Sequence, residues 1–176
     1  MNNLQDSLNK IKGNESFLEK MKRIIPGYDG YVNRDNSREL DTLLRNQLAL
    51  KLEQNRTKIK NTVANFSRNG KLFEASDIDK LDKKNDTVVA KFRSAARGYS
   101  GAFDVVKVKE EKLNQLYEFD SLMLSMVEEI NSLFEQLEST SSANQATRDI
   151  ESTISTTLDK ILVKFDERES LLKNIQ

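Results

Sequence analysis

The sequence predicts an all-α protein, an elongated antiparallel helical bundle or coiled coil of about five helices with no sheet. Glycine occurs 6 times and proline once in 176 residues, so the residues that usually end helices and open loops are scarce. Charged residues make up 32% of the chain, a composition typical of long amphipathic helices. Apolar residues recur every three or four positions over most of the length, which is the period of one helix face.

The first two periodic segments predict a short helix and then a long one. Residues 3–24 keep helical spacing, with Glu15 and Lys22 as polar positions on the stripe, and Pro26 ends them. We expect this helix, within residues 1–25, to dock on the core or to project from it. The next stripe predicts one continuous helix from Asp35 or Asn36 to Gly70, about 50 Å long. Its members are Leu40, Leu44, Leu48, Leu52, Ile59, Val63 and Phe66.

The middle of the chain predicts a third helix, a connector and a fourth helix. Ser76 followed by Asp79 is close to a capping box, so the third helix should start there and end at Gly98. Residues 101–109 contain a strand-like run, but a single strand has no partner, so we predict an extended connector. From 113 to 137 apolar spacings of three and four alternate as in a coiled coil. Asp120 is the polar exception on that seam.

The last part of the chain predicts a loop and a final helix. Residues 138–147, ESTSSANQAT, are the best candidate for a flexible loop, and Ser142 to Gln145 could form a capping box. The final helix, 144–176, carries Arg168 on its apolar seam. We therefore expect a single helical domain over 1–176, with core helices in 34–138.

Composition excludes several kinds of chemistry. The chain contains no cysteine and no histidine, so it has no thiolate nucleophile, no imidazole base and none of the usual zinc ligands. We expect no enzyme activity, no cofactor and no metal. The first twelve residues lack the apolar core of a signal peptide, and no apolar run approaches the ~18 residues of a membrane span. These features favour a cytoplasmic protein.

Charge is balanced overall but unevenly placed. Residues 34–68 hold eight basic and four acidic side chains, whereas residues 98–138 hold three basic and nine acidic ones. This separation fits two helices that lie side by side, or one that meets a partner. The stretch 54–71 is basic without an acid, but the neutral total argues against a dedicated nucleic-acid binder.

Two G-Y-x-G turns, at Gly27–Gly30 and Gly98–Gly101, each follow a basic helix end and precede a long helix. A phosphate loop needs more glycines and a positioned lysine, so we interpret both turns as helix stops. The two halves could be a duplicated hairpin. Aromatic and arginine residues beside the turns form a candidate polar and aromatic cluster with Asp120; its members are Tyr28, Tyr31, Arg34, Arg38, Arg97, Tyr99, Phe103 and Asp120.

Asp120 must lie near an end of the bundle, be hydrated or be paired, because an unpaired carboxylate in a core costs several kcal/mol. Arg38, Arg93, Arg97 and Arg168 are the candidate partners. We favour a role in fixing helix register over a buried binding site. The arginines of 34–45 alternate with acids, and we interpret them as solvated ion pairs on a first helical turn.

Two stretches resemble signatures of a family of uncharacterised bacterial helical proteins. The first is GYDGYVNRDNSRELDTLLRNQLALKLEQNR, with an Asp-x-Leu-Arg-like element at 41–45; the second is FRSAARGYSGAFDVVKVKEEKLNQLYEFD. Together they cover roughly residues 27–130. The resemblance implies an all-helical fold and no catalytic residue.

The sequence as a whole favours a non-enzymatic helical scaffold or adaptor that acts through an unknown protein partner or through self-association. One alternative is a peripheral protein of a membrane surface, of the envelope-stress type, because basic stretches accompany amphipathic helices. A second alternative is weak nucleic-acid binding through residues 54–71.

Overall fold

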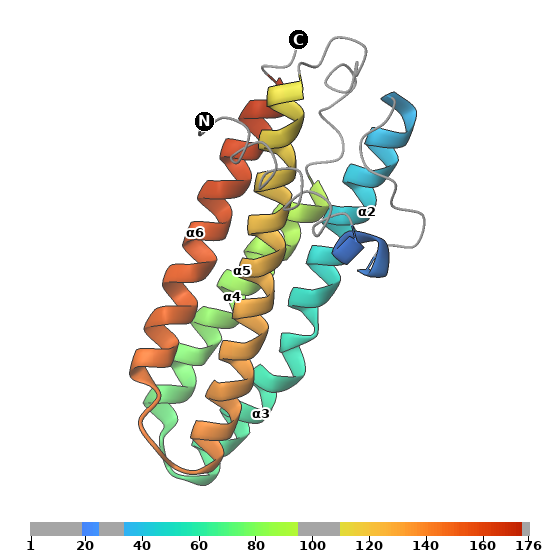
Figure 1. Cartoon of the computed structure of the whole chain (residues 1–176). Coiled ribbons are helices and arrows are strands. Elements are labelled where there is room, and N and C mark those ends of the chain that lie inside the picture. Colours follow the sequence, from blue (N-terminus) through green and yellow to red (C-terminus); the bar gives the residue numbers. More distant parts are fainter. Residues whose placement is uncertain (1–18, 25–33, 95–109, 174–176) are drawn as a thin grey trace, which may run out of the picture.

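The computed structural model describes residues 19–24, 34–94 and 110–173 of the chain (Figure 1). These residues form a helical stretch at 19–24 and five longer helices, and contain no strand, which confirms the predicted all-α class. The predicted connector 101–109 and both G-Y-x-G turns lie outside the described residues. The five longer helices are α2 (Arg34–Glu53), α3 (Asn55–Arg68), α4 (Leu72–Ser94), α5 (Glu110–Ser142) and α6 (Arg148–Lys173).

The helices form two hairpins that lie side by side. In the first, α2 and α3 follow one another and α4 returns antiparallel to them; in the second, α6 returns along α5 (Figure 1). Both hairpin turns lie at the same end of the bundle. The antiparallel prediction therefore holds within each hairpin.

Neighbouring helices from different hairpins run parallel. Asn55 bonds to Asn131 at 2.8 Å, and ten residues further on Asn65 bonds to Ser141 at 3.0 Å, so α3 and α5 point the same way. Lys84–Asp159 and Lys91–Asp166, each at 2.7 Å, show the same for α4 and α6. Each hairpin thus has its like-directed counterpart beside it. These hairpins are not the two halves of the repeat suggested by the sequence, whose G-Y-x-G turns lie outside the described residues.

The core confirms the seam predicted for the fourth segment. The described seam positions of α5 are all at most 2% exposed, and Asp120 is among them. The side chain of Leu113 is not described. At 33 residues α5 is about 50 Å long, so this seam runs through most of the bundle. Its buried positions are Leu116, Asp120, Met123, Val127, Ile130, Phe134 and Leu137.

The predicted continuous helix 35–70 is wrong at one point. α2 is already helical at Arg34 and ends at Glu53, and α3 begins at Asn55. Gln54 between them keeps right-handed helical angles, φ −59 and ψ −22, so the interruption is confined to this one residue. Asn85 of α4 is buried here and its amide donates to the backbone carbonyl of Leu52 at 3.2 Å. The Asn85 side chain thus gives the Leu52 carbonyl a hydrogen-bond donor at the break, and buried carbonyls require such a partner.

The start of the third predicted helix is also wrong. α4 begins at Leu72, and Ser76 lies inside it, because the preceding turn is closed by a different motif. Gly70 has φ +71; the Lys71 N–H bonds to the Phe66 carbonyl at 2.9 Å, and the Gly70 N–H to that of Ser67 at 3.3 Å. This is the Schellman pattern, with glycine at its left-handed position. Gly70 therefore ends α3, as predicted, and leaves only one residue before α4.

The first half of the predicted flexible loop 138–147 is helix. α5 continues to Ser142, and Asn144, at φ 55, closes it with the same pair of bonds: Gln145 N–H to Thr140 carbonyl and Asn144 N–H to Ser141 carbonyl, both 3.1 Å. The capping residue of α6 is not Ser142. Thr147 precedes the helix, and its hydroxyl bonds to the Glu151 carboxylate at 2.6 Å.

Replacement of Gly70 by alanine should lower the unfolding free energy by about 1–2 kcal/mol. No atom lies within 4 Å of the added Cβ, so the cost comes from the left-handed backbone alone. Asn144→Gly is the matched change at the other turn, and it should stabilise the protein by up to about 1 kcal/mol, because glycine adopts the left-handed backbone without the penalty of a Cβ. Urea unfolding followed by far-UV circular dichroism measures both. If both replacements changed the unfolding free energy equally and in the same direction, the left-handed conformation assigned to Gly70 and Asn144 would be contradicted.

The helical stretch 19–24 docks on the bundle. Met21 is 0% exposed, and Lys20 forms an ion pair with Glu128 of α5 at 2.7 Å. Lys22, which the spacing placed on the apolar stripe, is exposed, so the buried face of this stretch is one residue away from the predicted one. No helix in the described ranges is long and apolar enough to cross a bilayer.

Candidate functional site

Asp120 is buried and paired with one of its predicted partners. Its side chain is 0% exposed, and Arg168 Nε donates to Asp120 Oδ1 at 2.6 Å. Arg168 is itself 1% exposed and is the largest fully buried side chain of the described residues. The contact joins α5 and α6 within the second hairpin.

A second buried carboxylate, which the sequence reading did not place in the core, extends this pair. Asp41 of α2 is 1% exposed and its Oδ1 lies 2.7 Å from Arg168 Nη1. The two atoms are close but not aligned as a hydrogen bond, so this is an ion pair by proximity. It connects the first hairpin to the second.

Arg45 completes the network. Its Nε donates to Asp41 Oδ2 at 2.8 Å and its Nη1 to the Phe92 backbone carbonyl of α4 at 3.1 Å. The i,i+4 pair Asp41–Arg45 had been expected in solvent, yet both side chains are at most 2% exposed. The buried network Asp41–Arg45–Asp120–Arg168 therefore joins four helices: α2, α5 and α6 supply its side chains, and α4 supplies the Phe92 carbonyl.

The network carries two positive and two negative charges and is closed to solvent. Buried ion pairs of this kind contribute little net stability, because desolvation offsets their attraction, but removal of one member is costly. The carboxylates of Asp41 and Asp120 face the guanidinium groups of Arg45 and Arg168. The arrangement supports the reading of Asp120 as a device that fixes how the helices pair.

The other members of the candidate cluster are not placed at this site. Tyr28, Tyr31, Arg97, Tyr99 and Phe103 lie outside the described residues. Arg34 and Arg38 belong to the first turns of α2, but their side chains are not described. The structure thus brings Asp120 together with Asp41, Arg45 and Arg168. Asp41 and Arg45 come from the Asp-x-Leu-Arg-like element, which was the available signal for them.

Asp82 of α4 is a separate electrostatic feature. Burial, and then the nearby charge of Asp86, raise the pKa of the Asp82 carboxyl above its ordinary value, although Arg56 opposes them. Its Oδ1 is buried without a hydrogen-bond partner. The charged form of Asp82 is therefore disfavoured in the folded protein.

Asp82→Asn should raise the unfolding free energy at neutral pH by less than about 1 kcal/mol, because the amide has no charge to desolvate. The folded pKa lies above the unfolded one, so the penalty in the native protein disappears as pH falls through the raised value. Urea unfolding at neutral pH and at about pH 4 should show the higher unfolding free energy of Asp82→Asn only at neutral pH. Glu129→Gln, at an exposed position of α5, is the control. A gain that is independent of pH would contradict this account.

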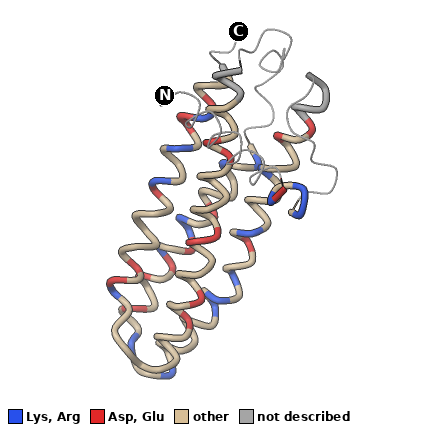
Figure 2. The backbone as a smooth tube through the Cα atoms, viewed as in Figure 1, with Lys and Arg blue, Asp and Glu red and all other residues tan. Residues whose placement is uncertain are grey.

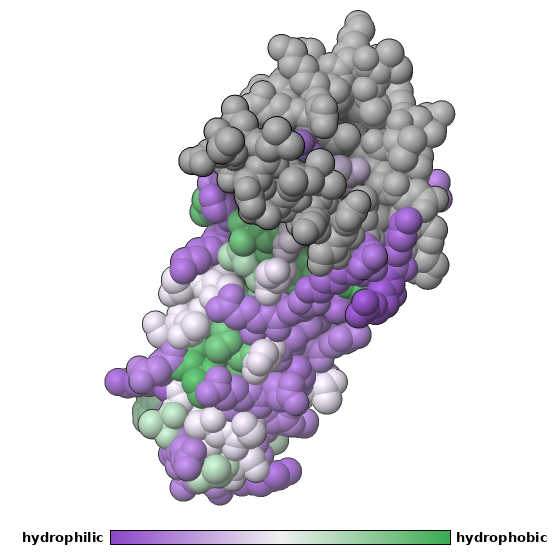
Figure 3. Space-filling model, viewed as in Figure 1, coloured by the Kyte–Doolittle hydropathy of each residue, from purple (hydrophilic) through white to green (hydrophobic). Residues whose placement is uncertain are grey.

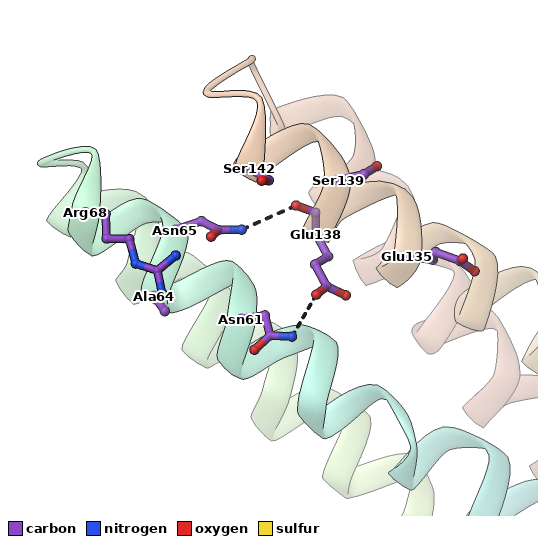
Figure 4. A pocket seen from close by; sticks show the side chains of 8 residues that line it. All are labelled: Asn61, Ala64, Asn65, Arg68, Glu135, Glu138, Ser139 and Ser142. Atoms are coloured by element: carbon purple, nitrogen blue, oxygen red, sulfur yellow. Dashed lines mark hydrogen bonds between the residues drawn. The ribbon is translucent and has the colours of Figure 1, made fainter.

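A polar groove of about 390 Å³ lies between α3 and α5 near the hairpin turns (Figure 4). Glu138 reaches from α5 into the space between the helices, where Asn61 donates to its carboxylate at 2.7 Å. Asn65 donates to the Glu138 backbone carbonyl at 3.4 Å and to the Ser141 hydroxyl at 3.0 Å. These groups satisfy one another, so the groove functions as a hydrogen-bonded seam between the parallel helices.

The basic and acidic segments lie side by side, as one reading of the sequence predicted. α3 contacts α5 along its length, and Figure 2 shows both signs of charge distributed along the bundle. Within 54–71, Arg56 pairs with Asp86 at 3.0 Å, Lys58 Nζ donates to the Asn131 carbonyl at 2.9 Å, and Lys71 Nζ to the Asn144 carbonyl at 3.4 Å. Much of the positive charge of this stretch is therefore used within the protein.

The two most exposed large apolar side chains of the described residues lie at the turn of the first hairpin. Leu72 is 68% and Phe73 91% exposed, side by side at the start of α4. The face seen in Figure 3 is otherwise largely hydrophilic where residues are described, with hydrophobic atoms in separate small areas. We call Leu72 and Phe73 the apolar tip.

The carboxylates of the described ranges form no group of three that could hold a metal ion. Comparison of the chain with protein-family models, curated proteins and solved structures gives no match.

Proposed function

We propose that the protein is a non-enzymatic helical scaffold or adaptor that acts by contact with another protein or with a second copy of itself. The observation that supports this is the apolar tip, because Phe73 is 91% exposed. Full burial of a phenylalanine side chain contributes about 1.5–3 kcal/mol, which this position leaves unused in the isolated chain. Phenylalanine is also enriched in the buried centres of protein interfaces.

The rest of the bundle suits a scaffold. The charged groups of its interior are paired with one another, and the groove between α3 and α5 is crossed by its own hydrogen bonds. A rigid rod with an apolar anchor at one end can hold a partner at a fixed distance from the other end. The absence of cysteine supports a cytoplasmic location as part of the same proposal.

Site-specific photo-crosslinking tests the proposal. A photoreactive phenylalanine analogue at position 73 should give a crosslinked protein adduct in living cells, identified by mass spectrometry. The same analogue at Thr156, an exposed position of α6, is the control. The purified partner should then bind the wild-type chain and lose at least about tenfold in affinity for Phe73→Ala. Adducts no stronger at 73 than at 156 would contradict the proposal.

A peripheral membrane-surface role is the alternative, because an apolar pair beside Lys71 could also enter a lipid headgroup layer. Flotation with vesicles that contain anionic lipid separates the two: protein that floats, and stops floating in Phe73→Ala, would favour the membrane. Nucleic-acid binding through residues 54–71 ranks lower, since Arg56, Lys58 and Lys71 already have partners in the protein.

A further inference from the structure

Three asparagines form a polar layer across the core beside the break between α2 and α3. The apolar stripe of α2 and α3 has a gap of seven positions before Ile59, and the stripe of α4 has the same gap before Val88. Asn55 and Asn85 occupy the two gaps, and both are 0% exposed. With Asn131 of α5 they make up what we call the asparagine layer.

Contacts between neighbouring helices hold the asparagine layer at one level of the bundle. Asn55 Nδ2 donates to Asn131 Oδ1 at 2.8 Å, and Asn85 Nδ2 donates to the Leu52 carbonyl at 3.2 Å. The residues that follow Asn55 and Asn85 along α3 and α4 form an ion pair with each other at 3.0 Å. The two buried asparagines therefore lie at the same height of the molecule, next to the α2–α3 break.

Two side-chain oxygens of the layer have no hydrogen-bond partner within the described part of the chain. They are Asn55 Oδ1 and Asn85 Oδ1, and both atoms are buried. The Asn85 amide cannot be reversed, because its oxygen would then face the oxygen of the Leu52 carbonyl. Asn55 bonds through one end of its amide, to Asn131, so the other end still needs a partner.

We infer that the asparagine layer is a binding site for internal water, which donates hydrogen bonds to Asn55 Oδ1 and Asn85 Oδ1. Nearly all buried polar groups in proteins have a partner, and buried water supplies it where no protein group does. The layer has a path to solvent at Asn131, which is partly exposed. This inference is independent of the apolar tip and of the proposed function.

The surroundings of the layer favour water over a cation. None of the three asparagines carries a charge, and Lys58 Nζ lies against the layer, where it donates to the Asn131 backbone carbonyl at 2.9 Å. The positive charge of Lys58 repels a second cation at this short range. Oxygen-bound Ca²⁺ also requires about six to eight ligands, whereas a buried water needs about two to four partners.

Water–amide NMR on the full chain, labelled with nitrogen-15, tests the inference. The side-chain N–H groups of Asn55 and Asn85 should show NOE and ROE signals to water of opposite sign, as expected for water that stays bound while the protein tumbles. Direct proton exchange gives the same sign in both experiments and is thereby recognised. Asn61, whose amide donates to Glu138 at an exposed groove, is the control and should show only the weak signals of surface water.

A pair of variants tests the inference by a second route. Asn55→Leu with Asn85→Leu removes both oxygens and keeps the branched shape of the side chains, so it should lower the number of long-lived water molecules in oxygen-17 relaxation dispersion. Asn61→Leu should leave that number unchanged. Thermal unfolding verifies that each variant is folded, and Asn55→Leu alone, which keeps the bond of Asn85 to α2, replaces the double variant if that one does not fold.

Three results would overturn the inference. The first is a signal at Asn55 and Asn85 no different from that of Asn61. The second is an unchanged number of long-lived water molecules in the folded variant that lacks these oxygens. The third is a chemical-shift change of the Asn55 and Asn85 amides on addition of sodium or potassium chloride that Asn61 does not share, because it would assign the two oxygens to a cation.

Discussion

Arg168→Met is expected to lower the unfolding free energy by about 3–5 kcal/mol. Arg168 contacts Asp120 at 2.6 Å and Asp41 at 2.7 Å, and both carboxylates are at most 1% exposed. Methionine keeps the length and apolar stem of the side chain but leaves two buried negative charges without their shared cation. Urea unfolding measures the loss, and Lys160→Met, at an exposed position of α6, should change stability by no more than about 0.5 kcal/mol.

The loss in Arg168→Met should depend on pH in a defined direction. Asp41 keeps its ion pair with Arg45, but removal of Arg168 makes the charged form of the buried Asp120 carboxyl less favourable in the folded variant than in wild type. As pH falls, the folded variant then binds more protons than its unfolded chain. Acidification should therefore reduce the difference in unfolding free energy between the variant and wild type. If this difference in unfolding free energy stayed constant from neutral pH to about pH 4, the loss of stability in Arg168→Met would come from packing alone.

Replacement of all four charged residues by apolar ones distinguishes stability from pairing specificity. Asp41→Leu, Arg45→Met, Asp120→Leu and Arg168→Met together should recover most of the stability lost in the single variant, since no buried charge remains. Because the chain has no cysteine, Asn65→Cys with Ser141→Cys gives an unambiguous disulfide reporter of α3–α5 register. Slower or incomplete closure in the apolar variant would confirm that the network fixes register.

The all-α class and the buried seam follow from the sequence because a periodic seam leaves little freedom. Along α5 each described position that the alternation of three and four residues predicts is buried, Asp120 included, and Leu124 and Met126 beside this seam are buried as well. The same spacing does not predict a buried, paired carboxylate that lies beside the apolar stripe. Asp41 lies next to the apolar stripe of Leu40 and Leu44, and α2 contacts both α4 and α5, so a wider arc of this helix is buried than one stripe indicates.

Helix ends were less predictable, for an identifiable reason. Ser76 and Ser142 satisfy the spacing of a capping box, but the backbone bonds of the preceding turns decide where the helices start and stop. Gly70 supplies the left-handed residue of one turn, and Asn144, with φ 55, that of the other. Asparagine carries a weaker signal than glycine for this conformation, so the end of α5 was placed too early and the turn too long.

Phe92→Ala and Phe165→Ala should each lower the unfolding free energy by about 3–5 kcal/mol. The two rings are at most 1% exposed and meet edge to face, with centroids 5.0 Å apart and planes at 74°. They belong to α4 and α6, so this aromatic contact joins the two hairpins. Urea unfolding of the single and double variants gives the coupling between them.

The double variant should be more stable than the sum of the single losses predicts, by about 0.5–1.5 kcal/mol, the usual value of an aromatic pair beyond its buried area. Phe66 of α3, at the opposite end of the bundle and 1% exposed, supplies the control: Phe66→Ala and Phe92→Ala should add within about 0.5 kcal/mol. The Phe92 backbone carbonyl, which accepts from Arg45, remains in the alanine variant. Coupling to Phe165 that persists when Arg168 is also replaced would therefore show that the hairpins are held by two independent contacts, one apolar and one ionic, at the same level of the bundle.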